Sequence, residues 1–303
     1  MKIMKKILFP LISGVLLLSS CAKTSDNLPE LSPVPTAAPT IAPTIEPLPT
    51  PTPEVIVNID VTGLRDTLQS MLSSYNGNWS VYVKELRAGN EILLNNSSTK
   101  AASVMKLFIM GAVLDSVNRG TLEYTSIQDD LYTMITESSN ECANSLLLVL
   151  GNGSYAEGIS CVNSFIANNG YDEYTAEYNG FEDPASFVGG SFNVTSVHDC
   201  GLILNDIYEG SCVSPEMSDI MLEILKDQQT DYKLVNNLPP DTVVANKSGE
   251  MDTVENDVGI VFSPNVDYII CVMSNDWSNP YSAIENIQTI SQTVYEYFNP
   301  VSE

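Results

Sequence analysis

Three short motifs in the chain carry side chains that could perform acyl-transfer chemistry. A Ser-x-x-Lys motif begins at Ser103, a Ser-x-Asn motif at Ser138 and a Lys-Ser-Gly motif at Lys247. A serine hydroxyl is a poor nucleophile unless a base lies within hydrogen-bonding distance. A lysine can be that base when burial and a neighbouring positive charge lower its pKa. The spacing therefore predicts Ser103 as a nucleophile and Lys106 as its base, with Lys247 as the neighbouring charge.

The second and third motifs would complete such a site. Ser138 could pass a proton to the leaving nitrogen of an amide substrate. Lys247 would supply positive charge for a substrate carboxylate, which is scarce in a chain with 38 acidic and 13 basic residues. Gly249 would let the backbone approach the substrate closely. The backbone amides of Ser103 and Glu250 could form an oxyanion hole.

Other kinds of site are not expected from the residue types. His198 is the only histidine, so a histidine triad cannot be built, and we expect an ordinary helix-surface or core residue there. The chain has no Cys-x-x-Cys pair, so we expect neither a metal site nor a cofactor. Cys21 aside, five cysteines remain. That number leaves at least one free thiol and allows one disulfide, whose partners the spacing does not assign.

The apolar pattern places the first motif at the start of a buried helix. From Val104 to Leu114 the residues are apolar nearly all round, which is typical of a helix inside a core. Ser103 and Lys106 would then lie one turn apart on the same face. A second Ser-x-x-Lys motif begins at Ser97, but it lies in a polar stretch that no apolar pattern continues.

The wider pattern predicts strands at both ends of the chain and helices in the middle. A helix is expected at 61–74, followed by strands at 79–86 and 91–95. Further helices are expected at 129–134, 140–150, 155–168, 197–207 and 215–226, with a loop at 169–195. The last part would add strands at 242–245, 257–262 and 268–273 and a helix at 283–298. This order predicts an α+β fold, with one antiparallel β-sheet, terminal helices packed on it and an all-helical lobe.

The three motifs, in this order, resemble the Ser-x-x-Lys, Ser-Asp-Asn and Lys-Thr-Gly set of class A β-lactamases and penicillin-binding proteins. Their flanking residues resemble the family as well. The resemblance implies a β-lactamase/transpeptidase-like fold and an acylated Ser103. It also implies that Ser138 and Asn140 relay a proton and position the substrate. Lys247 and Ser248 would bind the substrate carboxylate.

Several departures from the family pattern bear on turnover. The middle residue of the second motif is Ser139 in place of aspartate, and Asp257 stands about where the family has an arginine beside the carboxylate site. The loop at 169–195 contains no Glu-x-x-Leu-Asn, whose glutamate positions the deacylating water in class A enzymes. The nearest substitutes are Glu177, Glu182 and Asp183. Acylation of the nucleophile is therefore better supported than its hydrolysis.

The N-terminal segment is expected to export and tether the domain. Residues 1–20 have the basic start and short apolar core of a secretory signal, too short for a transmembrane helix. Cys21 follows in a sequence that resembles a bacterial lipobox, and 21–56 form a Pro/Thr-rich linker. The hydrolase domain at 57–303 would then be lipid-anchored to the outer face of the bacterial cytoplasmic membrane, in the cell envelope. We expect a monomer, and the acidic surface excludes nucleic acid as a partner.

Three functions are consistent with these residues. The first is a serine hydrolase resembling class A β-lactamases, which opens a β-lactam or related amide through an acyl-Ser103 intermediate. The second is a peptidase or esterase that acts on cell-wall peptides of the D-Ala-D-Ala type. The third is a lipoprotein that binds penicillin or wall peptide without turnover. The complete set of Ser103, Lys106, Ser138 and Lys247 argues against this third function.

Overall fold

The computed structural model describes residues 59–300, and the predicted signal, Cys21 and linker lie outside this range. Its helices are α1 (Thr62–Ser74), α2 (Lys106–Asn118), α3 (Gln128–Thr136), α4 (Asn140–Leu150), α5 (Tyr155–Asn168), α6 (Val197–Tyr208), α7 (Pro215–Lys226) and α8 (Pro280–Phe298). Its strands are β1 (Asn78–Glu85), β2 (Glu91–Leu94), β3 (Thr99–Lys100), β4 (Val194–Thr195), β5 (Val243–Met251), β6 (Val254–Phe262) and β7 (Tyr268–Asn275).

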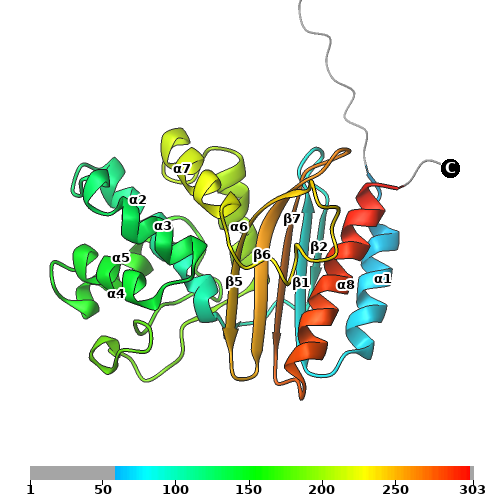
Figure 1. The fold of residues 1–303 in the computed structure, drawn as a ribbon, viewed down its shortest axis with the longest axis horizontal. Helices are drawn as coiled ribbons and strands as arrows, with labels where there is room; N and C mark the ends of the chain where they lie inside the picture. Colours follow the sequence, from blue (N-terminus) through cyan, green and yellow to red (C-terminus); the bar gives the residue numbers. More distant parts are fainter. Residues whose placement is uncertain (1–58, 301–303) are drawn as a thin grey trace, which may run out of the picture. The chain divides into compact units, whose positions relative to one another are not determined.

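The main sheet is antiparallel, with the strand order β2-β1-β7-β6-β5. The helices α1 and α8 lie side by side on one face, and the other helices lie on the far side of the sheet (Figure 1). Successive strand residues point to opposite faces. Val81 and Val83 therefore join the core under the two terminal helices, whereas Tyr82 joins the core shared with the helical lobe. The predicted α+β architecture is confirmed.

The helical lobe is built around α2. Every residue from Lys106 to Leu114 in this helix is buried, which agrees with its apolar pattern. The helices α3, α4, α5 and α7 supply the side chains that surround it. A helix packed on all sides cannot shift easily, because protein interiors are close-packed. The lobe therefore holds Lys106 in a fixed position.

The strand that carries the third motif is longer than the sequence pattern indicated. We expected a short strand at 242–245 that ended near Lys247, but β5 runs on to Met251 and pairs with β6 along its whole length. The pattern failed because these strands bury polar residues. Asn246, Lys247 and Asp257 are all fully or almost fully buried, and alternation of apolar and polar residues cannot reveal a strand of this kind.

The first motif also differs in detail from the prediction. Ser103 lies in a 3₁₀ turn, η1 (Ala102–Met105), and the α-helix proper begins at Lys106. The short strand β3 precedes this turn and pairs with β4, which ends the predicted loop at 169–195. The sequence pattern did not predict this two-stranded sheet. This pairing fixes the end of the loop beside the segment that leads to Ser103.

Two further features concern disulfide bonds and membrane-spanning helices. Five cysteines lie within residues 59–300 and all are free, with Cys200, Cys212 and Cys271 buried. The disulfide that the sequence allowed is therefore not formed among them. Within the same residues, no helix combines the length and the apolar character that crossing a membrane requires.

Candidate active site

The three motifs meet between the helical lobe and the edge strand β5. Lys106 Nζ lies 3.1 Å from Ser103 Oγ and 3.4 Å from Ser138 Oγ. Lys247 Nζ, from β5, donates a hydrogen bond of 3.0 Å to the same Ser138 hydroxyl. Two lysines and two serines that lie far apart in the sequence thus form one connected network. Such a network can move a proton from one serine hydroxyl toward the other.

Lys106 is fully buried and has four hydrogen-bond acceptors around its ammonium group. Besides the two serine hydroxyls, these are the Ser138 carbonyl and Asn140 Oδ1, each at 2.6 Å. Burial lowers the pKa of Lys106 to about 7, and the negative charge of Glu182 opposes this shift. A substantial fraction of Lys106 is therefore neutral near neutral pH. In that form it can accept the proton of Ser103 Oγ.

Lys247 is also fully buried, and its ammonium group donates to the Ser248 carbonyl at 2.8 Å as well as to Ser138. Burial, followed by the nearby charge of Lys106, lowers the pKa of Lys247 to about 7, while Asp257 opposes the shift. Each lysine thus disfavours the charged form of the other. The arrangement favours one neutral lysine and one charged lysine.

Three residues in or beside the site have backbone conformations that residues other than glycine rarely adopt. Ala102, just before Ser103, has φ of 48°, Ser138 has φ of 59° and Glu182 has φ of 57°. Strained backbone of this kind persists only where the surrounding structure enforces it, and it gathers at functional sites. The strain at Ser138 directs both its carbonyl and its hydroxyl to Lys106.

The middle residue of the second motif caps a helix. Ser139, which stands in place of the aspartate of the family motif, caps α4 by accepting a hydrogen bond from the Cys142 amide at 3.1 Å. Serine is a favoured residue at this helix position. Asn140 begins the helix and lines the cleft beside Ser103.

Gly249 of β5 packs closely against the turn that carries Ser103. A Cβ atom on Gly249 would lie 3.0 Å from the Ala101 carbonyl oxygen and 3.0 Å from the amide nitrogens of Ser103 and Val104. Only glycine leaves the space for this contact. The contact brings the next residue of the edge strand, Glu250, to the cleft that Ser103 lines.

The cleft in front of Ser103 has a volume of about 440 Å³. Of the predicted site residues, Ser103, Asn140 and Glu250 line it. The others do not: Ser138 is half-buried, and the buried ones are Lys106, Lys247, Ser248 and Gly249. Its other lining residues come mainly from the loop after α5, and they include Phe181, Glu182, Phe187 and Phe192. A cleft of this size fits a small organic substrate.

An aromatic side chain occupies the part of the cleft next to Lys106. The ring centroid of Phe181 lies 4.7 Å from Lys106 Nζ. Asn144 of α4 fixes this residue, since its Nδ2 donates to the Phe181 carbonyl at 2.7 Å and its Oδ1 accepts from the Phe181 amide at 2.8 Å. The sequence pattern assigns neither residue to the site. The signal available was an asparagine one turn after Asn140 on the same helix.

The three acidic residues proposed to replace the deacylating glutamate have different surroundings. Glu177 is fully buried, lines a separate groove beside α5, and neither carboxylate oxygen has a hydrogen-bond partner within residues 59–300. Asp183 caps the short turn η3 (Pro184–Ser186) by accepting from the Ala185 amide at 2.9 Å. Glu182 is therefore the one candidate of the three that lines the cleft.

Lys233, which the sequence pattern does not single out, adds a further lysine beside the third motif. Its fully buried ammonium group donates to the Gly249 carbonyl at 3.3 Å and pairs with Glu255 at 2.5 Å. Asp257 holds the same segment by accepting from the Leu234 amide at 3.1 Å. Lys233 lies in a polar stretch between α7 and β5, where no periodic pattern marks it.

The comparisons with known proteins agree with this fold. The family model described as the β-lactamase enzyme family matches residues 63–126 and 123–298. A β-lactamase from Sphaerobacter thermophilus DSM 20745 has 19% identity and a TM-score of 0.69, and the match covers 81% of this chain and 100% of that one. PBP-A has 23% identity and a TM-score of 0.70, with 80% and 97% covered. A β-lactamase from Chitinophaga pinensis DSM 2588 has 23% identity and a TM-score of 0.69, with 78% and 99% covered.

No curated protein sequence matches the chain. The family match nevertheless extends over most of it, and the fold is that of β-lactamases and PBP-like proteins. These findings define a hydrolase of the β-lactamase type. The chain belongs to the β-lactamase enzyme family.

Proposed function

We propose that the protein opens β-lactams, or related amides, by acylation of Ser103. The observation that carries the proposal is the distance of 3.1 Å between Lys106 Nζ and Ser103 Oγ, with Lys106 buried. Neutral Lys106 would accept the hydroxyl proton as Oγ bonds to the lactam carbonyl carbon. The amides of Ser103 and Glu250 would stabilise the resulting oxyanion.

Collapse of this tetrahedral intermediate would break the carbon–nitrogen bond and leave an ester on Ser103. The leaving nitrogen must then gain a proton. The Ser138 hydroxyl would donate it and be resupplied by Lys106, which holds the proton taken from Ser103, over the 3.4 Å that separates Nζ from Ser138 Oγ. Charged Lys247 would attract the substrate carboxylate, and Ser248 would help to bind it.

The acyl-enzyme should be hydrolysed slowly. The apolar ring of Phe181 lies against Lys106, so this residue offers no carboxylate there to activate water. Glu182 is exposed to solvent and sits one residue further along the loop. A point mutant of PBP-A, a protein of the same fold, has been crystallised as an acyl-enzyme complex with penicillin G. These observations favour a penicillin-binding behaviour, with acylation faster than turnover.

Intact-mass spectrometry with penicillin G tests the mechanism. We expect the wild-type protein to gain the mass of one penicillin, and Ser103→Ala to gain none. Absence of the adduct together with unchanged penicillin would contradict acylation of β-lactams. Rapid loss of penicillin without a lasting adduct would instead mean that Glu182 or another group activates water efficiently.

Phe181→Glu tests why the ester lasts. We expect the glutamate to shorten the lifetime of the adduct by about 10²-fold or more, the usual contribution of a general base. Phe181→Gln is the matched control, since it has a similar shape to Glu without the charge. Equal adduct lifetimes in the two variants would rule out the placement of a base at this position as the missing element.

The same geometry supports a second candidate, acyl transfer from a cell-wall peptide of the D-Ala-D-Ala type. Such a peptide ends in a carboxylate, which Lys247 would attract, and it needs the same nucleophile. A slow reaction with penicillin favours this candidate. Release of D-alanine from a D-Ala-D-Ala peptide by the wild-type protein, and not by Ser103→Ala, would establish it.

We further propose that the domain acts as a monomer, anchored through Cys21 to the outer face of the cytoplasmic membrane. The lipobox-like sequence before Cys21 supports this location. Metabolic labelling with a fatty acid should mark the wild-type protein and not Cys21→Ala. Labelling of both proteins, or of neither, would contradict the anchor.

A further inference from the structure

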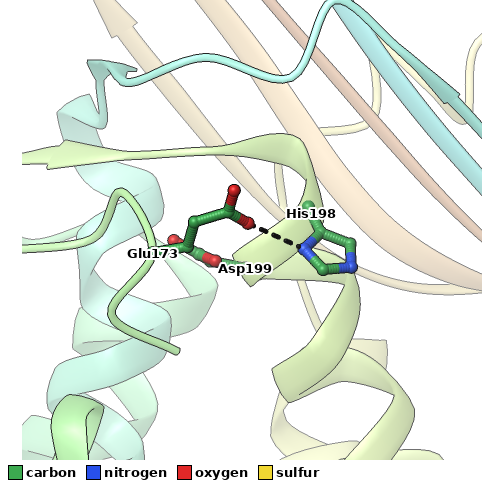
Figure 2. Close-up of side chains that lie close together, drawn as sticks. All are labelled: Glu173, His198 and Asp199. Atoms are coloured by element: carbon green, nitrogen blue, oxygen red, sulfur yellow. Dashed lines mark hydrogen bonds and ion pairs between the residues drawn. The ribbon is translucent and has the colours of Figure 1, made fainter. Parts of the chain in front are cut away.

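A second cluster of polar side chains lies outside the cleft, at the start of the loop after α5. Glu173 comes from this loop, and His198 and Asp199 come from the first turn of α6 (Figure 2). His198 Nδ1 lies 3.3 Å from Glu173 Oε2, and one donor atom from each of the three residues lies within 4.8 Å of the other two. Imidazole and carboxylates in this combination are ligands for divalent transition-metal ions.

Two buried oxygen atoms beside the cluster lack a hydrogen-bond partner. Asp199 is fully buried, and its Oδ2 accepts from the Tyr174 amide and the Thr175 hydroxyl. Its Oδ1 accepts from no residue between 59 and 300. Asn96 Nδ2 contacts Glu173 Oε2 at 3.4 Å, and the buried Asn96 Oδ1 has no partner within the described chain. Buried oxygens are almost always paired. A cation would pair Asp199 Oδ1, and it would pair Asn96 Oδ1 after rotation of that amide group.

The surroundings of the cluster favour a cation. Glu173 and Asp199 bring two carboxylates together in a chain of formal charge −25. Bringing two carboxylates together costs free energy that a bound cation offsets. His198 is also held in place, because its ring lies edge-on to Tyr82 with 5.8 Å between the ring centroids.

We propose that Glu173, His198 and Asp199 bind a divalent first-row transition-metal ion. Rotation of the Asn96 amide group would bring its oxygen toward Glu173 as a fourth ligand, since the two ends of an amide are interchangeable in shape. With one histidine and no Cys-x-x-Cys pair, the sequence itself predicts no metal site. The fold supplies the other ligands from segments distant in the sequence.

The proposed ion would link three segments next to the active site. Asn96 lies just before β3, which leads to Ser103, and Glu173 starts the loop that carries Phe181. The same loop returns through β4 to α6, where His198 and Asp199 lie. The ion would therefore stabilise the base of the loop that lines the cleft, without touching the reacting atoms.

Calorimetric titration of the full-length protein with Mn²⁺ tests this site. Mn²⁺ is a suitable probe because it prefers oxygen and imidazole to the thiols of the free cysteines. We expect one saturable site and a melting temperature that rises with Mn²⁺ concentration. Glu173→Gln and His198→Gln should each weaken binding by about tenfold or more. Glu173 is exposed, so its replacement leaves the fold intact.

Glu223→Gln is the matched control, because it removes one negative charge from an exposed ion pair with Lys226 on α7. Its affinity for Mn²⁺ should equal that of the wild type. The proposal would be overturned if the wild-type protein showed no saturable binding. It would also be overturned if Glu173→Gln, His198→Gln and the control bound Mn²⁺ with equal affinities. Neither result depends on acylation of Ser103.

Discussion

Lys106 and Lys247 compete for protons around the Ser138 hydroxyl. The proposed mechanism needs Lys106 without its extra proton, so that it can act as a base. It needs Lys247 with its proton, so that it can attract a carboxylate. Both groups have a pKa of about 7, because burial disfavours their charged forms. In the productive state of the site, Lys106 is therefore neutral and Lys247 carries the one positive charge of the pair.

The rate of acylation should have a bell-shaped dependence on pH with its maximum near neutrality. Below that pH, Lys106 is charged and cannot accept the Ser103 proton; above it, Lys247 loses the charge that attracts the substrate. Stopped-flow acylation by a penicillin between about pH 5 and 9 measures both limbs. Lys247→Arg should keep the acid limb and lose the alkaline limb, since a guanidinium stays charged. A rate independent of pH would contradict these roles.

Substitution of Gly249 tests the contact between β5 and the turn that carries Ser103. In Gly249→Ala the new Cβ would crowd backbone atoms of Ala101 and Ser103, so the strand must move away from the turn. The amides of Ser103 and Glu250 would then be displaced from the oxyanion. We expect acylation to slow by roughly 10²-fold, the effect of a misplacement of about 1 Å.

Gly63→Ala, at an exposed position of helix α1, is the control for this substitution. Its Cβ would meet only the Tyr297 ring, at ordinary contact distances of 3.6 Å and more, and acylation should not change. Similar acylation rates for Gly249→Ala and the wild type would show that the close approach has no role in the chemistry.

At the scale of elements, the loop after α5 is held by hydrogen bonds at several points. Asn193 Oδ1 accepts from the amides of Tyr178 and Asn179, and Asn193 Nδ2 donates to the Asn179 carbonyl at 2.9 Å. Asn144 fixes Phe181 in the middle of the loop. Uncharged amide groups thus determine where the loop places its aromatic side chains.

Glu177 of this loop destabilises the folded protein at neutral pH. Burial raises the pKa of Glu177 well above the usual value, and no residue within 59–300 pairs with its carboxylate. The folded protein binds this proton more tightly than the unfolded chain does. Its stability must therefore fall as pH rises through and above the usual pKa of a glutamate.

Glu177→Gln should remove this loss of stability. We expect the melting temperature of the variant to exceed that of the wild type by a few degrees at pH 7. The difference should shrink as the pH is lowered to about 4, where glutamate is mostly protonated in both states. Thermal denaturation followed by circular dichroism at both values measures it. A variant less stable than the wild type at pH 7 would mean that the carboxylate has a partner.

The sequence revealed the elements whose patterns depend on apolar burial alone. The apolar run that predicts α2 exists because every residue from Lys106 to Leu114 lies in the core. The patterns that predict α4 and α8 have similar reasons. The sequence shortened β5, because buried polar residues such as Asn246 and Lys247 break the alternation. It did not reveal Phe181 or Lys233. Their positions depend on hydrogen bonds to Asn144 and Gly249, which are distant in the sequence.

At the scale of the whole molecule, the sheet separates two cores. One lies under α1 and α8, and the other joins the sheet to the helical lobe. The site lies at the edge of the sheet, where β5 meets the lobe and where an unpaired strand edge can offer amides to a substrate. The buried lysines give this edge positive charge within a molecule that is otherwise strongly acidic.

The excess of 25 negative charges should affect how fast an anionic substrate reaches the cleft. Repulsion at long range slows the approach of a penicillin, and salt screens it over about 10 Å at 0.1 M. We expect the second-order rate of acylation to rise roughly two- to threefold between low ionic strength and 0.15 M salt. A β-lactam ester without a carboxylate is the control, and its rate should change little. If salt instead slows acylation by the anionic substrate more than acylation by the ester, the expectation is wrong. Attraction by the local cluster of Lys106, Lys233 and Lys247 would then outweigh repulsion by the net charge of the protein.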